Sequence, residues 1–141
     1  MNRITESLYR ISGVELTEGM NSGPKVITPK FSNELSAAEF MCDFINEHNM
    51  NMGGSEWEVM NMHEDEPGIK AFSIGTDDGL IEVSMQRQSD GEVDVFPYDT
   101  YVKQDGDEPY SRIPMKDFLE RFIDQMISDS WEYDEETGRF E

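Results

Sequence analysis

Three side chains in this sequence, one cysteine and two histidines, are of the types that most often carry nucleophilic or metal chemistry. Cys42 has no second cysteine to pair with, so it could act only as a free thiol nucleophile. It borders the apolar face of a predicted helix, a position typical of a small core residue. His48 continues the same face, and we interpret it as a boundary or capping residue. We therefore expect neither residue to be catalytic.

His63 and two acidic segments are the candidates for metal binding. His63 precedes Glu64, but a single histidine beside an acidic turn does not complete the ligand set of a transition metal. The segment from Asp105 to Glu108, with Asp99, could hold Ca²⁺ loosely, but it lacks the spacing of an EF-hand loop. The sequence also lacks the phosphate-loop, dinucleotide, zinc-protease, hydrolase and Cys-x-x-Cys patterns. We predict a protein that is not an enzyme and binds no metal or cofactor.

Carboxylates are by far the most abundant charged groups. The 141 residues include 31 acidic and 11 basic side chains, a formal net charge of -20 at pH 7. Residues 31–141 alone carry 28 acidic and 7 basic side chains. Such a chain repels phosphate and anionic lipid, so direct binding to nucleic acid or membrane is excluded. One cysteine and no apolar run of about 18 residues favour a soluble protein of a reducing compartment, the cytoplasm.

The acidic side chains are expected to form rows with few basic neighbours. Glu39, Asp43 and Glu47 repeat every four residues in a predicted helix, where each like-charged pair costs about 0.2–0.5 kcal/mol. We also expect a row of three on one face of a strand, spaced by about 7 Å, and a row of three on a second helix. A surface of this kind suits a basic partner. The predicted partner-binding residues are Glu39, Asp43, Glu47, Glu56, Glu58, Asp90, Glu92, Asp94, Asp117, Glu120 and Asp124.

Two helices are predicted to position these rows. The capping-box pattern from Ser36 to Glu39 indicates a helix over residues 35–49, whose apolar residues share one face. Pro114 is suited to the first position of a second helix. The apolar stripe that follows, from Met115 to Ile127, is the clearest helical pattern in the chain.

Period-two alternation between the two helices predicts short antiparallel strands. Asp78-Gly79 and the segment from Ser89 to Gly91 are turn sequences that separate them. Residues 98–103 and 110–113 are expected to form a last strand pair. The predicted fold is α+β: a four- or five-stranded antiparallel meander, packed with a preceding helix and a long C-terminal amphipathic helix.

Four regions are expected along the chain. Residues 1–18 are predicted to form a short amphipathic leader helix, and residues 19–33, rich in Pro, Gly and small polar residues, a linker. A single α+β domain is expected over 34–131. Residues 132–141 are predicted to be an acidic tail that frays.

The N-terminal segment carries a resemblance to phage proteins. Leu16-Thr17-Glu18-Gly19 follows a predicted helix in which Ile4, Leu8 and Ile11 share a face. This string resembles the sites that the head-maturation protease of contractile-tailed phages cuts after glutamate, and the segment resembles leaders that target internal proteins into the prohead. The resemblance implies cleavage between Glu18 and Gly19. Familiar internal head proteins are basic, and this chain departs from them. The alternative is an ordinary N-terminal helix docked on the domain.

These patterns give a leading hypothesis and three alternatives. The leading one is a non-enzymatic, phage-encoded acidic protein that occupies the basic cleft of a host nucleic-acid-binding protein, similar to the phosphate mimics that inhibit restriction or CRISPR systems. It would act in the host cytoplasm. One alternative is an internal or scaffold-core protein of the phage head, processed after Glu18, with head components as partners and a place in the virion. A second is an acidic surface that serves only solubility. A third is an enzyme built on Cys42 or His63, which alanine replacement of both residues would test.

Overall fold

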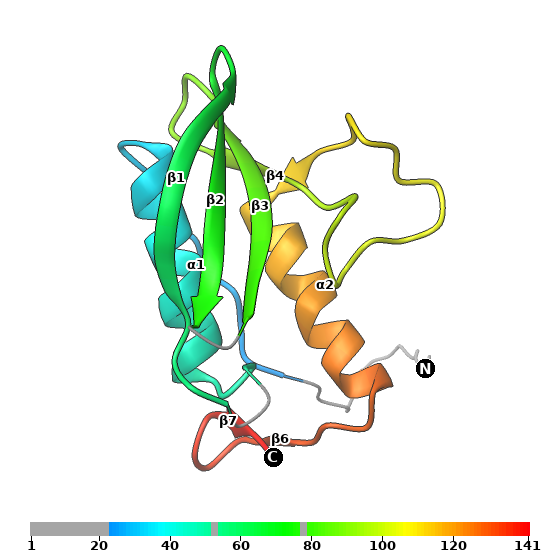
Figure 1. Ribbon diagram of the computed structural model, residues 1–141. Coiled ribbons are helices and arrows are strands. Elements are labelled where there is room, and N and C mark those ends of the chain that lie inside the picture. The colour runs from blue at the N-terminus through cyan, green and yellow to red at the C-terminus, as the bar shows by residue number, and fades with distance from the viewer. Residues whose placement is uncertain (1–22, 52–53, 77–78) are drawn as a thin grey trace.

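The computed structural model of the chain describes residues 23–51, 54–76 and 79–141. The predicted leader helix with Ile4, Leu8 and Ile11 and the predicted cleavage position at Glu18 and Gly19 lie outside the described residues. Within them, two helices and a five-stranded sheet form the main body (Figure 1). In chain order the elements are α1 (Glu34–Glu47), β1 (Glu58–Glu66), β2 (Ile69–Thr76), β3 (Gly79–Arg87), β4 (Val93–Phe96), β5 (Ile113–Pro114), α2 (Met115–Ser128), β6 (Tyr133–Asp134) and β7 (Arg139–Phe140).

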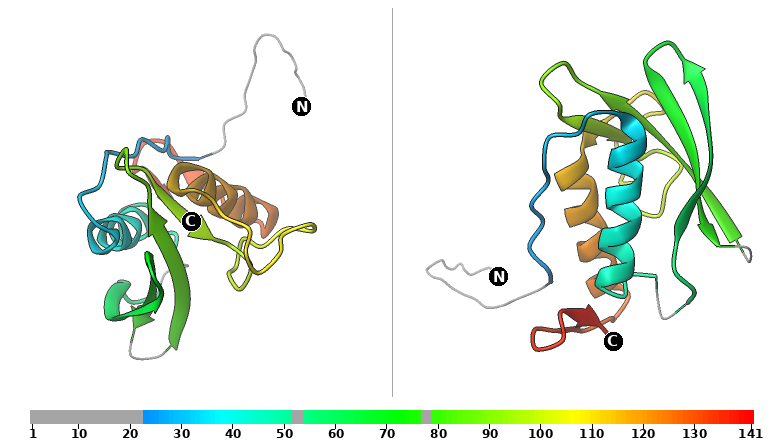
Figure 2. Two further views of the ribbon diagram at one scale, coloured as in Figure 1. Left: turned by 90° about the horizontal axis from the view of Figure 1, so that it is seen from above. Right: turned by 90° about the vertical axis from the view of Figure 1, so that its left-hand side faces the viewer.

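The sheet is an antiparallel meander in the order β1-β2-β3-β4-β5, and both helices lie against one of its faces (Figure 2). Helix α1 contacts β1, β2 and β3, whereas α2 contacts β4 and β5. The strands turn apolar side chains toward the helices at alternate positions. Phe72 and Ile74 of β2 and Met85 of β3 are fully buried there. The predicted α+β fold is confirmed.

Local interactions explain where the helices begin and end. The Asn33 side chain accepts a hydrogen bond from the Ser36 backbone amide at 2.8 Å, so Asn33 caps α1. The Ser36 hydroxyl donates to the Asn33 carbonyl oxygen at 2.9 Å. His48 is the C-terminal cap, as expected from its place at the end of the apolar face. Pro114 stands as the N-cap of α2, with φ of -57°, which suits the helix that follows.

The segment between β4 and α2 differs from the prediction. Residues 98–103 and 110–113 do not pair with each other; instead, residues 97–112 form a loop of successive turns, and β5 pairs with β4. This segment has little apolar alternation, and its backbone groups are satisfied by turns such as the bond from Asp107 N to Gln104 O at 3.1 Å. An ion pair of 2.9 Å between Asp107 and Arg121 fastens the loop to α2. The prediction of a last strand pair was therefore wrong.

The predicted linker is packed where the structure describes it. Val26 and Phe31 are buried in the main core, and the Phe31 backbone amide donates to the Gly91 carbonyl at 2.8 Å. Arg87 donates its Nε hydrogen to the Phe31 carbonyl oxygen at 2.6 Å. Apolar residues spaced between prolines can anchor an extended segment without regular structure, so the core begins before residue 34.

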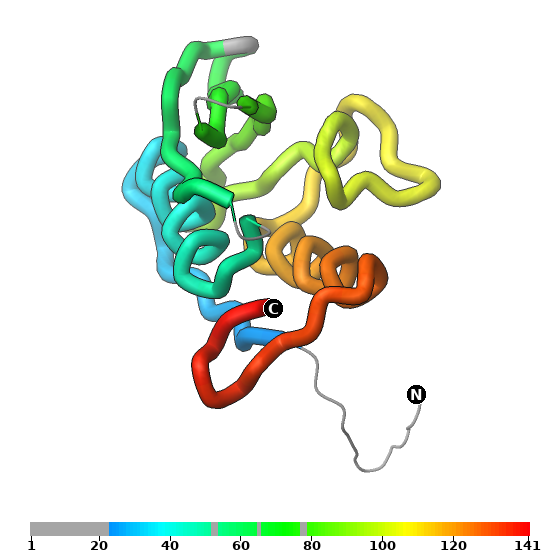
Figure 3. Tube along the Cα trace, turned by 60° about the horizontal axis from the view of Figure 1, so that its bottom comes forward, coloured from blue at the N-terminus to red at the C-terminus, as the bar shows by residue number. Residues whose placement is uncertain are grey.

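The C-terminal residues are also part of the core, and the prediction that they fray was wrong. β6 and β7 form a small hairpin, and Figure 3 shows it folded back toward the C-terminal end of α1. The Phe140 side chain is fully buried. Its backbone amide donates to the His48 carbonyl oxygen at 2.9 Å, and its ring packs on that of Tyr133. One aromatic side chain thus anchors a segment whose composition suggested disorder.

Candidate interaction surfaces

The first predicted row lies on the exposed side of α1. Glu39, Asp43 and Glu47 all face solvent, whereas Met41 and Ile45 are buried on the opposite side of the helix. The rise of an α-helix places successive members of the row about 6 Å apart. None of the three carboxylates takes part in an ion pair among the residues that the structure describes.

Hydrogen bonds of the Asn46 side chain place a further carboxylate, that of Glu58, beside this row. The Asn46 side-chain oxygen accepts from the Trp57 backbone amide at 2.8 Å, and its side-chain nitrogen donates to the Trp57 carbonyl at 2.9 Å. This two-bond clamp fixes the start of β1 against α1. Glu58, the next residue, therefore lies beside Glu39 and Asp43, and the three line a hollow of about 240 Å³. We call this surface the acidic hollow: Glu39, Asp43 and Glu58, with Glu47 continuing it along α1.

Cys42 lies at the base of the acidic hollow, but its thiol is held in an unreactive state. The side chain is 4% exposed. Burial raises the pKa of the thiol to about 12, and the nearby carboxylates, Asp43 first, add to the shift. The thiol is therefore protonated at neutral pH, which supports the interpretation of Cys42 as a small core residue.

Every basic side chain of residues 30–141 contacts another part of the same molecule. None of these contacts involves a carboxylate of the acidic hollow, so no basic side chain of residues 30–141 neutralises its charge. Arg139 contacts the C-terminal end of α1, but it donates to the main-chain oxygen of Glu47 rather than to its carboxylate. The contacts pair Lys30 with Glu92, Lys70 with Glu64, Arg87 with the Phe31 carbonyl, Lys103 with the Tyr98 ring, Arg112 with Asp94, Lys116 with Glu120, Arg121 with Asp107, and Arg139 with the Glu47 carbonyl.

The second predicted row, Asp90, Glu92 and Asp94, is not a strand face. Asp90 lies in the turn before β4, where Gly91 has a φ of 91°, and its carboxylate accepts from the Glu92 backbone amide. Glu92 pairs with Lys30 at 2.6 Å, and Asp94 lies 3.5 Å from Arg112. Partial burial raises the pKa of Asp94 even though Arg112 opposes the shift. Much of the charge of this row is thus compensated within the molecule.

The third row lies on α2. Asp117, Glu120 and Asp124 are exposed, at spacings of three and four residues. Lys116 approaches Glu120 to 4.0 Å, a pair in the i, i+4 relation. Loss of part of its hydration shell raises the pKa of Asp124. Glu56, predicted alongside Glu58, is exposed just before β1. Glu56 and the α2 row lie outside the acidic hollow, whose acidic lining residues are Glu39, Asp43 and Glu58.

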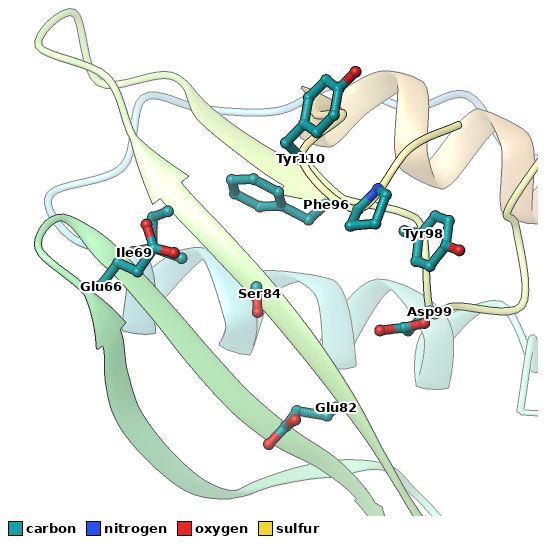
Figure 4. Close-up of a pocket in the computed structure, with 9 residues that line it drawn as sticks. Glu66, Ile69, Glu82, Ser84, Phe96, Tyr98, Asp99 and Tyr110 are labelled. Atoms are coloured by element: carbon teal, nitrogen blue, oxygen red, sulfur yellow. The ribbon is translucent and has the colours of Figure 1, made fainter. Parts of the chain in front are cut away.

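A groove on the other face of the sheet was not foreseen from the sequence. It has a volume of about 450 Å³ and lies between the sheet and the loop over residues 97–112 (Figure 4). We call it the aromatic groove, because rings of Phe96, Tyr98 and Tyr110 line it together with the carboxylates of Glu66, Glu82 and Asp99. The Tyr98, Asp99 and Tyr110 cluster was the available signal, but the prediction had assigned these residues to strands.

The predicted weak metal candidates are dispersed. Among the described residues, no three His, Cys, Asp or Glu side chains converge on a position that could hold a metal ion. His63 is exposed on β1. Asp107 accepts hydrogen bonds from the Gln104 amide and from Arg121, and these contacts lower the pKa of its carboxyl group.

The comparisons with known proteins add no relative. No family model matches the chain, and neither the curated proteins nor the solved structures give a significant match. In the described part of the chain, no helix is long and apolar enough to span a membrane.

Proposed function

We propose that this protein is a non-enzymatic acidic binding protein that places the acidic hollow and the α1 row in the basic cleft of a nucleic-acid-binding protein. The observation that carries the proposal is the absence of any described ion pair at Glu39, Asp43, Glu47 and Glu58, while every base of residues 30–141 is engaged elsewhere. The phage origin and the host identity of the partner belong to the same proposal.

The spacing of the row supports nucleic-acid mimicry. Carboxylates about 6 Å apart along a rigid helix present regularly spaced anionic oxygens. Arginine and lysine side chains that bind phosphate use the same charge-assisted hydrogen bonds to bind carboxylate. The Asn46 clamp holds Glu58 beside the row, so the charges are positioned before a partner arrives.

The energetics favour a partner of opposite charge. Two like-charged i, i+4 pairs on α1 each cost about 0.2–0.5 kcal/mol in the free protein. A basic cleft would relieve this repulsion and would also be steered toward the surface by long-range attraction. An acidic surface needed only for solubility would have no need for a row without lysines.

The predicted acidic residues differ in how far their charge is compensated within the molecule. Glu39, Asp43, Glu47 and Glu58 form the primary surface of the proposal. The row of Asp90, Glu92 and Asp94 is secondary, because Lys30 and Arg112 already pair with it. The alternative of a phage head protein processed after Glu18 stays a prediction, since Glu18 lies outside the described residues.

The test compares two triple variants of equal net charge. The first replaces Glu39, Asp43 and Glu47 by lysine, and the matched control replaces three exposed acids away from the hollow, Asp105, Glu135 and Glu136, by lysine. Each protein is immobilised and incubated with nuclease-treated bacterial lysate, and the retained proteins are quantified by mass spectrometry. The proposal expects a nucleic-acid-binding protein to be retained by the wild type and the control but lost from the α1 variant. Equal retention by all three proteins would remove the α1 row from the interface.

A further inference from the structure

The aromatic groove has a well-supported wall. The loop over residues 97–112 is fastened to α2 at two points, by the ion pair of Asp107 with Arg121 and by a hydrogen bond from the Tyr101 hydroxyl to Asp129, the residue that caps the helix. The opposite side is the open face of the sheet, where Glu82 and Ser84 of β3 line the groove (Figure 4). The volume of about 450 Å³ falls within the range of ligand-binding pockets, roughly 300–1,000 Å³.

Two tyrosine rings of this groove differ in their surroundings, since one is exposed and the other contacts a cation. Tyr110 is 77% exposed, so its ring is accessible to a ligand. Tyr98 already binds a cation within the molecule, because the Lys103 ammonium nitrogen lies 4.4 Å from the centroid of its ring. The groove thus contains aromatic surface of the kind that attracts positive charge.

Carboxylates from three different segments line the same groove. Glu66 lies at the end of β1, Glu82 on β3 and Asp99 in the loop. None of the three forms an ion pair among the described residues. The two bases of the same loop are occupied, Lys103 by Tyr98 and Arg112 by Asp94 and Gln86.

We propose that the aromatic groove binds an arginine side chain from an extended basic segment of a partner protein. A guanidinium group is planar, so it can stack on a tyrosine ring while its N–H groups bind carboxylates at its edge. A lysine ammonium group lacks the planar stacking surface. The groove lies on the sheet face opposite to the two helices, so this inference goes beyond the proposed function and does not depend on the α1 row.

The test is an NMR titration of the full chain, labelled with ¹⁵N, with three capped tripeptides. These are acetyl-Gly-Arg-Gly-amide, the lysine equivalent, and the equivalent with citrulline, which has the shape of arginine without its charge. Small monovalent probes are used because longer cationic peptides would bind any surface of so acidic a protein. We expect the arginine peptide to shift the amide resonances of β3, residues 96–99 and residues 109–110, and to bind about fivefold more tightly than the lysine peptide. The citrulline peptide should cause no saturable shifts.

Four variants separate the groove from general electrostatic attraction. Tyr110→Leu and Glu82→Gln should each weaken binding of the arginine peptide by about fivefold, whereas Tyr110→Phe should retain it because the ring remains. Glu39→Gln removes the same charge as Glu82→Gln but lies outside the groove, and it should leave the affinity unchanged. Shifts spread over all acidic surfaces, or equal losses in Glu39→Gln and Glu82→Gln, would overturn the proposal. Failure of the α1 variant in the lysate experiment would not affect this result, so the two proposals fail separately.

Discussion

Replacing Asp43 by lysine should stabilise this protein, although the residue is proposed to bind a partner. Asp43 lies between Glu39 and Glu47, at i, i+4 spacing from each, with Glu58 across the acidic hollow. The substitution converts two repulsive pairs into two attractive ones.

The size of the effect follows from these two pairs. Each repulsive pair costs about 0.2–0.5 kcal/mol, and each attractive pair contributes a similar amount, so the total change is about 1–2 kcal/mol at low salt. For a domain of this size, the expected rise in the melting temperature is about 3–6 °C. At 1 M salt the Debye length falls to about 3 Å, and most of the gain should disappear.

Thermal and urea unfolding at low and high salt measure this effect. Asp105→Lys is the matched control, because it makes the same change of net charge at an exposed loop position outside the rows. The difference between the two variants isolates the repulsion within the α1 row from the benefit of reducing the overall charge. If Asp43→Lys gains no more stability than Asp105→Lys, repulsion between the carboxylates of the α1 row does not destabilise the protein.

Three further predictions concern parts of the structure that the composition did not reveal. Phe140→Ala should reduce the free energy of unfolding by about 3–5 kcal/mol, because the ring is fully buried, while Arg139→Ala next to it should cost far less. Equal effects of the two variants in urea unfolding would show that the C-terminal hairpin does not anchor the core. Cys42 should react slowly with a thiol reagent at pH 7.5, because burial and nearby carboxylates raise its pKa to about 12, and in denaturant it should react at the rate of an exposed cysteine. Fast labelling of the native protein would contradict the burial. Asp107→Asn should destabilise the protein at neutral pH, because contacts to Gln104 and Arg121 lower the pKa of Asp107. The stability that the ionised Asp107 contributes is complete above the ordinary carboxyl pKa and is lost as pH falls through the lowered pKa. The urea midpoints of wild type and variant should therefore converge at acidic pH.

The elements that follow from local patterns were predictable from the sequence. The apolar stripe of α2, the alternation of β2, β3 and β4, and the turn at Gly91 each depend on residues close together in the chain. The antiparallel meander then follows because short connections favour antiparallel neighbours. The row on α1 was predictable for the same reason, since residues four apart share a helical face.

The features that were missed depend on contacts between distant residues. Phe140 and Val26 enter the core from segments whose composition resembles a tail and a linker, and nothing local indicates where such side chains pack. The pairing of Lys30 with Glu92 joins residues 62 positions apart. The Asn46 clamp on Trp57, which completes the acidic hollow, and the loop wall of the aromatic groove are of the same non-local kind.

Competition with duplex DNA tests the central claim most directly. The protein captured by wild type but not by the α1 triple variant is purified, and its binding to wild type is measured with increasing duplex DNA at fixed salt. The account predicts that DNA displaces this protein completely, with an inhibition constant equal to the affinity of the partner for that DNA, and that both affinities fall as salt rises. Binding of the partner to both molecules at once, with no displacement, would contradict nucleic-acid mimicry.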